Sequence, residues 1–151
     1  MSLTFSQLGA RQRESDIARL MTLALQRPEL LSLAAGFTDN RTLPLAELTE
    51  IAGLLEADGD LSVLQYGPNQ GNPKLRELMT DRLQLQDGFA GRYDLERSFV
   101  TNGSQQALYL AVQTLCDPGD IVLVEQPTYF VFLEMLRGLG VRAVSMPMDS
   151  A

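Results

Sequence analysis

The sequence is poor in the side chains that most enzymes use for acid-base and metal chemistry. Its 151 residues include no histidine, no tryptophan, one cysteine (Cys116) and one lysine (Lys74). Histidine is the commonest metal ligand and the side chain that titrates nearest neutral pH. Its absence argues against zinc chemistry and Ser-His-Asp hydrolysis, and we expect no metal site. A lone cysteine cannot form a disulfide within the chain.

Long apolar runs and a basic charge balance are also absent. Residues 1–16 lack the continuous apolar stretch of a signal peptide, and nowhere do 18 apolar residues run together. The formal net charge is -7, so charge gives no reason to expect nucleic acid or an anionic membrane surface as a partner. We therefore expect a soluble, cytoplasmic protein that binds neither.

The first ninety residues are predicted to be mainly helical. Apolar residues at helical spacing predict helices over 15–26, 44–55 and 73–86, with Ser15 and Asn72 as N-caps. The apolar residues of the second helix are expected to face inward. These are Leu45, Leu48, Ile51 and Leu55.

From Arg97 onward the pattern changes to short β-type runs between helical stretches. This alternation is typical of βαβ units and a parallel sheet, so the predicted fold class is α/β. The expected strands and helices are, in chain order, 98–101, 104–115, 121–124, 128–139 and 141–146.

A glycine-rich polar run at 88–96 is the best candidate for a boundary between two parts of the chain. We expect residues 1–90 to form an N-terminal segment and residues 91–151 to form the first part of a larger domain. A parallel sheet needs cover on both faces, and three short strands with two helices are a thin version of it. The pattern favours a part of a larger protein, with a small autonomous α/β domain as the alternative.

The most informative local feature is the passage from a predicted strand through Gly103 and Ser104 straight into a helix. This geometry aims backbone N–H groups and the positive end of the helix dipole at one point, which suits phosphate. The alternative is an ordinary turn with Ser104 as N-cap. The Gly-x-Gly-x-x-Gly and P-loop lysine patterns are absent, which weakens dinucleotide and nucleoside-triphosphate interpretations.

Four segments resemble class I/II aminotransferases, which are fold-type I enzymes that depend on pyridoxal phosphate. The segments occur along this chain in the same order as in the family. Residues 101–108 (Thr-Asn-Gly-Ser-Gln-Gln-Ala-Leu) are similar to the family's phosphate cup, and residues 66–76 to its Y-G-P-x-x-G-x-P-x-L-R motif. Residues 117–129 are similar to its D-P-G-D…E-x-P-x-Y segment. Residues 31–36 with Leu43-Pro44 resemble the subgroup of 2-aminoadipate and kynurenine aminotransferases. The resemblance implies the large domain of that fold, a three-layer αβα arrangement with a mostly parallel sheet, cut short and preceded by a helical segment.

The resemblance also implies roles for single residues. Gly103, Ser104 and Gln105 would hold the cofactor phosphate, and Tyr129 would stack on the pyridine ring. Tyr66 would reach the phosphate in the neighbouring subunit of a homodimer. Gly36 would lie where the substrate α-carboxylate passes close to the backbone, a place where a Cβ would intrude.

Each of these residues also has a purely structural interpretation. Tyr129 is compatible with a core or surface tyrosine at a helix start, and Tyr66 with a loop tyrosine that packs on proline. Gly36 is compatible with a glycine needed only for a turn. Arg19 and Arg41 are weak candidates for pairing with a substrate carboxylate, because solvated arginines near loops are common.

The family's cofactor lysine and its substrate-binding arginine come from segments that have no match here. Lys74 falls where the family pattern has a variable surface residue, so we expect it to be exposed and without a catalytic role. The implied activity is transfer of an amino group from an L-amino acid to a 2-oxo acid, and the chain is expected to be a truncated, inactive part of such an enzyme.

Two other functions remain open. One is the aminotransferase-like sensor domain of a transcriptional regulator, which would require further sequence before Met1. The other is a non-catalytic phosphate-binding α/β module, which the turn at Gly103 and Ser104 alone would support.

Overall fold

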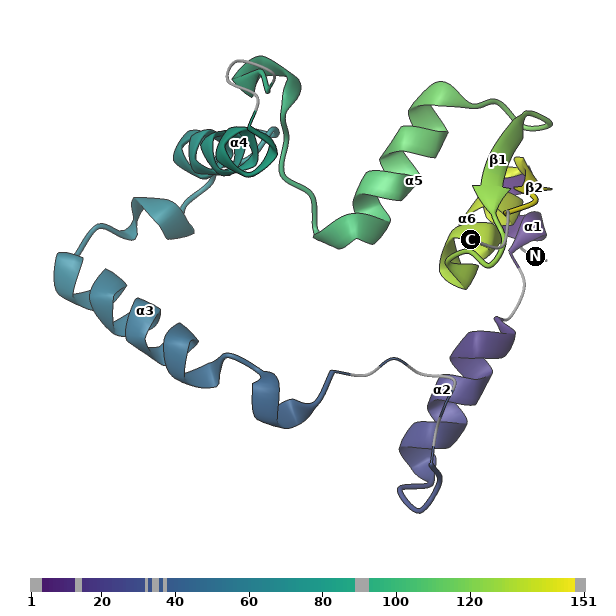
Figure 1. Ribbon diagram of the computed structural model, residues 1–151, viewed down its shortest axis with the longest axis horizontal. Coiled ribbons are helices and arrows are strands. Elements are labelled where there is room, and N and C mark those ends of the chain that lie inside the picture. Colours follow the sequence, from purple (N-terminus) through teal and green to yellow (C-terminus); the bar gives the residue numbers. More distant parts are fainter. Residues whose placement is uncertain are drawn as a thin grey trace. The chain divides into compact units, whose positions relative to one another are not determined.

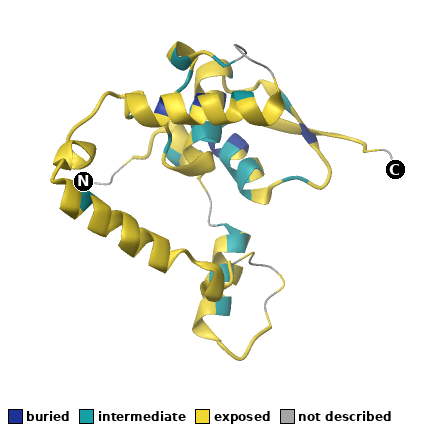
Figure 2. Ribbon diagram, turned by 60° about the vertical axis from the view of Figure 1, so that its left-hand side comes forward, coloured by how far each residue is buried: buried dark blue, intermediate teal, exposed yellow. Residues whose placement is uncertain are grey.

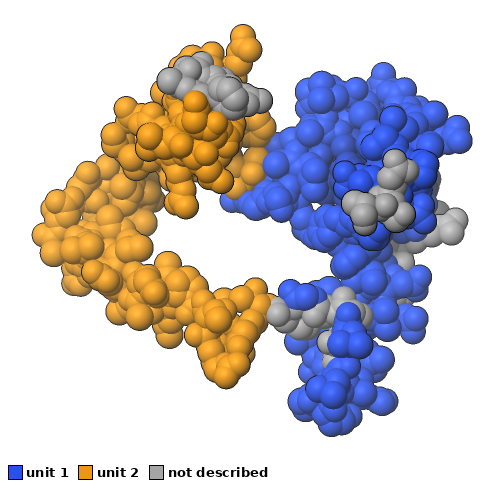
Figure 3. Space-filling model, viewed as in Figure 1, with its two compact units in different colours: residues 1–37, 102–151 blue, residues 38–101 orange. Residues whose placement is uncertain are grey.

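The computed structural model describes residues 4–12, 15–31, 33, 36, 38–88 and 93–148. The chain divides into two compact units (Figure 3). Unit 1 comprises Met1–Phe37 and Asn102–Ala151, and unit 2 comprises Thr38–Thr101.

Unit 1 is built from helices and a small sheet that come from the two ends of the chain (Figure 1). Its elements are, in chain order, α1 (Gln7–Arg11), α2 (Asp16–Gln26), α5 (Gly103–Leu115), β1 (Ile121–Glu125), α6 (Phe130–Leu139) and β2 (Arg142–Met146).

The sheet pairs β1 with β2 in parallel, with α6 as the crossover between them. Ile121 lies opposite Arg142, and Glu125 lies opposite Met146. Successive residues of a strand face opposite sides of the sheet. The exposures of β1 alternate accordingly, since Val124 is 7% exposed and Leu123 is 60% exposed. The described residues therefore cover one face of the sheet.

The core of unit 1 lies between the covered face of the sheet and helices α5 and α6 (Figure 2). Leu136 of α6 is fully buried, at 0% exposure, and Val112 of α5 is buried beside it. Val124 of β1 and Val141, which precedes β2, complete the cluster. Half-buried apolar side chains pack around these four: Cys116, Val122, Phe132 and Leu139.

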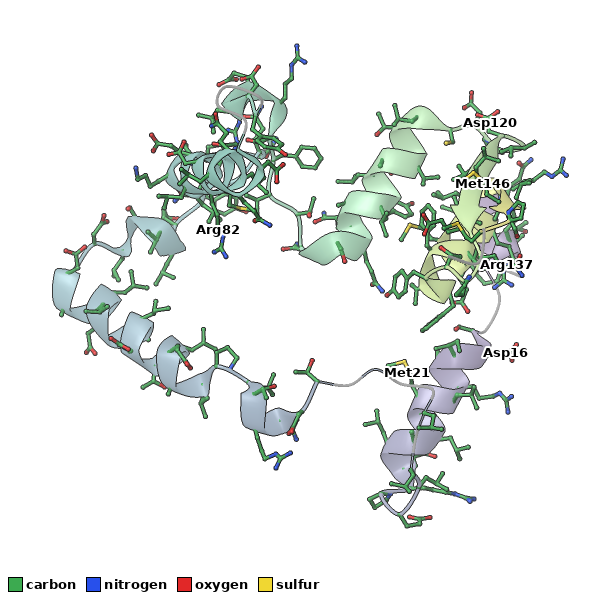
Figure 4. The ribbon with its side chains drawn as sticks, in the orientation of Figure 1. Asp16, Met21, Arg82, Asp120, Arg137 and Met146 are labelled. Carbon is green, nitrogen blue, oxygen red and sulfur yellow. The ribbon has the colours of Figure 1, made fainter. Side chains whose placement is uncertain are left out.

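The turn that connects α5 to β1 is bonded to the segment that connects α6 to β2. Gly119 donates its backbone N–H to the carbonyl of Gly140 at 2.8 Å, and Arg142 donates to the carbonyl of Asp120 at 2.8 Å. The Asp120 carboxylate, labelled in Figure 4, accepts from the N–H of Asp117 at 2.8 Å. These bonds fix where the two strands begin side by side.

The N-terminal arm packs on α6. Arg11 at the end of α1 donates its Nε to the carbonyl of Gly138 at 3.0 Å. A cation there suits the negative end of the α6 dipole, where Arg137 also lies (Figure 4). Ser15 accepts from the N–H of Ala18 as the N-cap of α2 and donates its hydroxyl to Glu134 at 2.7 Å.

Unit 2 is helical. Its elements are the 3-10 helices η1 (Asn40–Thr42), η2 (Leu61–Leu64) and η3 (Leu95–Arg97), with α3 (Leu45–Asp58) and α4 (Pro73–Asp87).

The start of α4 follows from its sequence. Asn72 accepts from the N–H groups of Lys74 and Leu75 at 2.9 and 3.3 Å, and Pro73 occupies the first turn, where a missing N–H is tolerated. Gly88 ends the helix with a φ of 68°, a left-handed value that suits glycine.

A buried arginine joins α4 to the segment that follows it. Arg76 is 6% exposed and donates to the carbonyl of Leu95 and to the hydroxyl of Ser98. Val100 donates its N–H to the carbonyl of Gln70 at 2.8 Å. A Cβ at Gly71 would lie 2.7 Å from the Val100 side chain, so only glycine fits this contact without a shift. The loop at residues 66–72 is thereby held against residues 98–100.

The predicted helices and the parallel pairing of the two C-terminal strands are confirmed, with ends that differ by at most three residues. Ser15 and Asn72 are the N-caps, as predicted. The predicted strand at 98–101 is wrong, because these residues form no β-ladder in the described chain. Ser98 instead donates its N–H to Leu95 of η3, and Val100 donates to a loop carbonyl.

The expected burial of the α3 face is also wrong for this structure. Leu45, Leu48 and Ile51 are 74, 59 and 53% exposed, and only Leu55 is half-buried. Their spacing is typical of a helix face that packs against another element, but no element in the described part of unit 2 covers this face. The predicted division near residue 90 falls partly on residues 89–92, which lie outside the described ranges, and stays a prediction.

Replacing Leu136 by alanine should lower the free energy of unfolding by about 2–5 kcal/mol, because it leaves a cavity beneath α6. Urea denaturation followed by circular dichroism measures the change. Leu115→Ala is the matched control, since Leu115 is 79% exposed and its truncation should change stability by no more than about 0.5 kcal/mol. Equal effects of the two substitutions would contradict the described core.

Candidate functional site

The start of α5 carries the predicted phosphate-binding residues. Gly103, the first residue of the helix, has a φ of 77°, which a residue with a side chain adopts only under strain. The side chain of Asn102 makes no capping bond. Gln106 instead accepts from the N–H of Asn102 at 2.5 Å, which satisfies a donor ahead of the helix. The polar cap of α5 thus comes from within its own first turn.

This helix start fits an anion in shape and charge. Ser104 and Gln105 are exposed, and a Cβ added at Gly103 would meet no atom within 4 Å. The first turn of α5 contains no acidic residue. A phosphate approaching the helix dipole therefore meets no carboxylate from that turn. The residues present fit the phosphate of the cofactor that the sequence implies.

Tyr129 lies next to this helix start. It immediately precedes α6 as its N-cap residue and is 46% exposed. Gln105 donates its Nε2 to the Tyr129 hydroxyl at 3.0 Å. The ring centroids of Tyr129 and Phe130 are 5.5 Å apart, with the planes tilted by 50°. The structure thus brings together Tyr129 and the Gly103–Gln105 turn, which the sequence places 24 residues apart. Sequence reasoning did not anticipate the bond that joins them.

Tyr66 lies in unit 2, in the loop that leads to α4. Its side chain is fully exposed, and its N–H donates to the side chain of Gln65 at 2.9 Å. The loop lines a cavity of about 340 Å³ together with Ser62 of η2 and Asn72. An exposed phenol on a loop braced by Gly71 is compatible with a contact to another molecule, and its predicted role stays a prediction.

Gly36 is exposed, and a Cβ added to it would meet no atom within 4 Å. The described residues thus leave space at this position, as the predicted role requires. Much of the surrounding segment that carried the resemblance, including Ala34 and Ala35, lies outside the described residues.

The candidate cations Arg41 and Arg19 have acidic neighbours. Arg41 forms a two-pronged pair with Asp39, with its Nη2 2.6 Å from a carboxylate oxygen. This pairing lowers the pKa of the Asp39 carboxyl. Arg19 lies 3.9 Å from Asp16. The Arg41 side chain therefore pairs with a neighbouring carboxylate, which agrees with its being only a weak candidate for binding a substrate carboxylate.

Lys74 is exposed, as expected, and is paired. Its Nζ lies 2.7 Å from Glu77 Oε2, one turn further along α4. The hydrogen bond that Lys74 donates to Glu77 and the charge of that carboxylate raise the pKa of Lys74. A nucleophilic lysine needs the opposite shift, because only the neutral amine attacks a carbonyl. The surroundings of Lys74 thus oppose a nucleophilic role.

Within the described residues, no cluster of cysteine, aspartate and glutamate side chains is suited to hold a metal ion. In the same part of the chain, no helix is long and apolar enough to span a membrane.

Comparison with known proteins identifies relatives along most of the chain. The family model "Aminotransferase class I and II" matches residues 28–151. The 2-aminoadipate transaminase of Thermus thermophilus is 32% identical over 147 residues, which cover 97% of this chain and 34% of the relative. The uncharacterized HTH-type transcriptional regulator YjiR of Escherichia coli is 32% identical over 148 residues, which cover 85% of this chain and 31% of the regulator.

A similar structure is that of kynurenine aminotransferase from Pyrococcus horikoshii, solved in complex with PMP. It superimposes with a TM-score of 0.84 at 31% identity, over 96% of this chain and 35% of the other. The chain thus spans about a third of the length of the relatives it matches. The predicted resemblance, the subgroup and the fold class are confirmed by these matches.

The Glu77→Gln substitution should lower the pKa of Lys74, because it removes the carboxylate that stabilises the ammonium. NMR titration of the Lys74 side chain measures this directly. In the wild type the pair stabilises the folded chain while Lys74 is protonated, and this contribution is lost as the pH rises through the raised pKa. Asp81→Asn is the control: Asp81 is the smallest of the causes that raise this pKa, so its removal should lower it less. A larger effect of Asp81→Asn would contradict the described pairing.

Proposed function

We propose that this chain, which belongs to the class I and II aminotransferase family, provides the phosphate-holding and ring-stacking part of a pyridoxal-phosphate site. The whole protein would transfer an amino group from an L-amino acid to a 2-oxo acid. The observation that carries the proposal is the hydrogen bond that joins Gln105, at the start of α5, to Tyr129, at the start of α6.

In this proposal the phosphate is held by the first turn of α5. The backbone N–H groups at Ser104 and Gln105 would donate to its oxygens, and the Ser104 hydroxyl would add a further donor. Gly103 allows the chain to turn into the helix without a side chain at the point of approach. The dipole of a 13-residue helix would favour the negative charge.

Tyr129 would limit the motion of the cofactor ring. The residue is 46% exposed, and stacking of its ring on the cofactor would exclude water from one side of the pyridine. When bound, pyridoxal phosphate supplies an electron sink that stabilises negative charge at the substrate Cα. The task of Tyr129 is to orient the ring, and it moves no proton in this proposal.

Two further parts of the proposal concern Tyr66 and Gly36. Tyr66, fully exposed on its loop, would donate its hydroxyl to the cofactor phosphate of a second copy of the protein, which implies a homodimer. Gly36 would let the substrate α-carboxylate pass close to the backbone. We also propose a cytoplasmic location for the protein.

The 151 residues alone are proposed not to catalyse the transfer. Lys74, the single lysine, is exposed and ion-paired, with a raised pKa. In the proposed enzyme the lysine that bonds to the cofactor and moves the proton at the substrate Cα is therefore a different residue. The arginine for the substrate α-carboxylate is likewise proposed to come from other sequence.

A second candidate function is favoured by the similarity to YjiR, which is named as a transcriptional regulator. In that case the aminotransferase-like part would sense the cofactor or an amino acid without turnover. Assays of the intact gene product for transamination and for DNA binding distinguish the two functions. DNA binding without turnover would favour the regulator.

The chain should bind pyridoxal phosphate more tightly than ATP or NAD, because the proposed site offers a stacking ring beside one phosphate position. Fluorescence titration measures the three dissociation constants. Tyr129→Leu should weaken pyridoxal phosphate binding about 2- to 10-fold through lost stacking. Tyr93→Leu, at a tyrosine of unit 2 whose hydroxyl contacts Asp87, should have no effect. Equally tight ATP or NAD binding would instead favour a general phosphate-binding module.

Removing Lys74 should leave pyridoxal phosphate binding unchanged. The Lys74→Met chain is expected to have the dissociation constant of the wild type, because the ammonium is held by Glu77. Borohydride treatment with one equivalent of cofactor should leave the Lys74 peptide unmodified in a mass spectrum. Stoichiometric attachment at Lys74, with turnover of an amino acid, would show that the chain carries its own catalytic lysine.

A further inference from the structure

The two consecutive glutamines at the start of α5 make different hydrogen bonds. Gln106 turns back along the chain and accepts from the N–H of Asn102. Gln105 reaches out of the helix and donates to the Tyr129 hydroxyl at 3.0 Å. The side chain of Gln105 is thus engaged with a tyrosine, while its backbone N–H is the group that belongs to the helix start.

We propose that Gln105 is a positioning residue whose amide sets the orientation of the Tyr129 ring, and that its contribution to a phosphate is made by its backbone alone. This inference rests on the proposed cofactor site. It assigns the Gln105 side chain to the part of the site that holds the cofactor ring. The sequence resemblance had assigned the whole residue to the part that holds the phosphate.

The packing of unit 1 explains why such a bond is needed. The position of the Tyr129 backbone is fixed by β1 before it and α6 after it, and both pack on the core around Leu136. The ring itself extends from the helix start and is 46% exposed. Its neighbour Phe130 is in tilted contact at 5.5 Å, which does not fix where the hydroxyl points. The bond from Gln105 restrains that end of the ring.

The size of the effect follows from the exposure of the bond. A hydrogen bond that competes with water contributes modestly to binding, so Gln105 should act by limiting the orientations of the ring. A ring that samples more orientations stacks less well on a planar ligand. Loss of the Gln105 amide should therefore weaken the binding of ligands that carry a ring. This loss of affinity should depend on the presence of the Tyr129 hydroxyl.

A double-mutant cycle on the full chain tests the proposal, with pyridoxal phosphate as the probe. Gln105→Met removes the donor, Tyr129→Phe removes the hydroxyl but keeps the ring, and the third variant combines both. Each single variant should weaken binding about 2- to 10-fold. The double variant should bind pyridoxal phosphate no more weakly than the weaker-binding single variant, because both changes break the same bond. Gln113→Met, at an exposed position on the same helix, is the control and should bind as the wild type does.

A spectroscopic readout without ligand completes the test. In the cofactor-free chain, Tyr129→Phe should shift the side-chain amide resonances of Gln105 and leave those of Gln113 unchanged.

Multiplicative losses of affinity in the cycle, or unmoved Gln105 resonances, would overturn the proposal while leaving cofactor binding itself intact. Failure of the wild-type chain to bind pyridoxal phosphate would overturn the proposed function, and this inference with it. Circular dichroism of all variants shows whether their folds are equal.

Discussion

The packing of α5 and α6 against one face of the β1–β2 pair is the contact on which the proposed site depends. Leu136 is fully buried in it, and Val112 and Val124 close the cluster from the helix and the strand. Because the core fixes both helices, it also fixes where each helix begins. Gly103 and Tyr129 lie at those two starts, so hydrophobic packing further along the helices sets the separation between the proposed phosphate position and the proposed stacking ring.

The same packing leaves apolar surface uncovered elsewhere. Ile121 and Leu123 on the other face of the sheet are 55 and 60% exposed, and Leu45 and Leu48 of α3 are exposed as well. Parallel sheets are generally covered on both faces. The chain spans about a third of the length of its relatives, and in unit 1 the described residues build one helical layer on one face of the sheet. That layer carries the residues that the proposed function uses.

Short sequence patterns predicted the features that depend on neighbouring residues, such as the helix caps. Ser15 and Asn72 were identified as caps because a side-chain oxygen next to a helix start satisfies its free N–H groups. The strand at 98–101 was wrongly predicted because β-type composition does not say where the partner strand lies, and Ser98 and Val100 bond to a 3-10 turn and a loop instead. Motif similarity identified Gly103 and Tyr129 as site candidates. The bond between Gln105 and Tyr129 could not be predicted from the sequence, because it joins residues 24 apart and depends on how α5 and α6 pack together.

The groups that the chain would offer to a cofactor at the proposed site are uncharged. They are the backbone N–H groups of the α5 start, the Ser104 hydroxyl and the Tyr129 ring, and the first turn of α5 contains no acidic side chain. A site of fixed dipoles holds an anion without a titrating cation, and the sequence has no histidine to introduce one. Protonation of the ligand phosphate, with a second pKa of about 6, would then contribute to the pH dependence of binding near neutrality. Preference for the dianion would follow from the helix dipole and from the lack of a carboxylate in the first turn of α5.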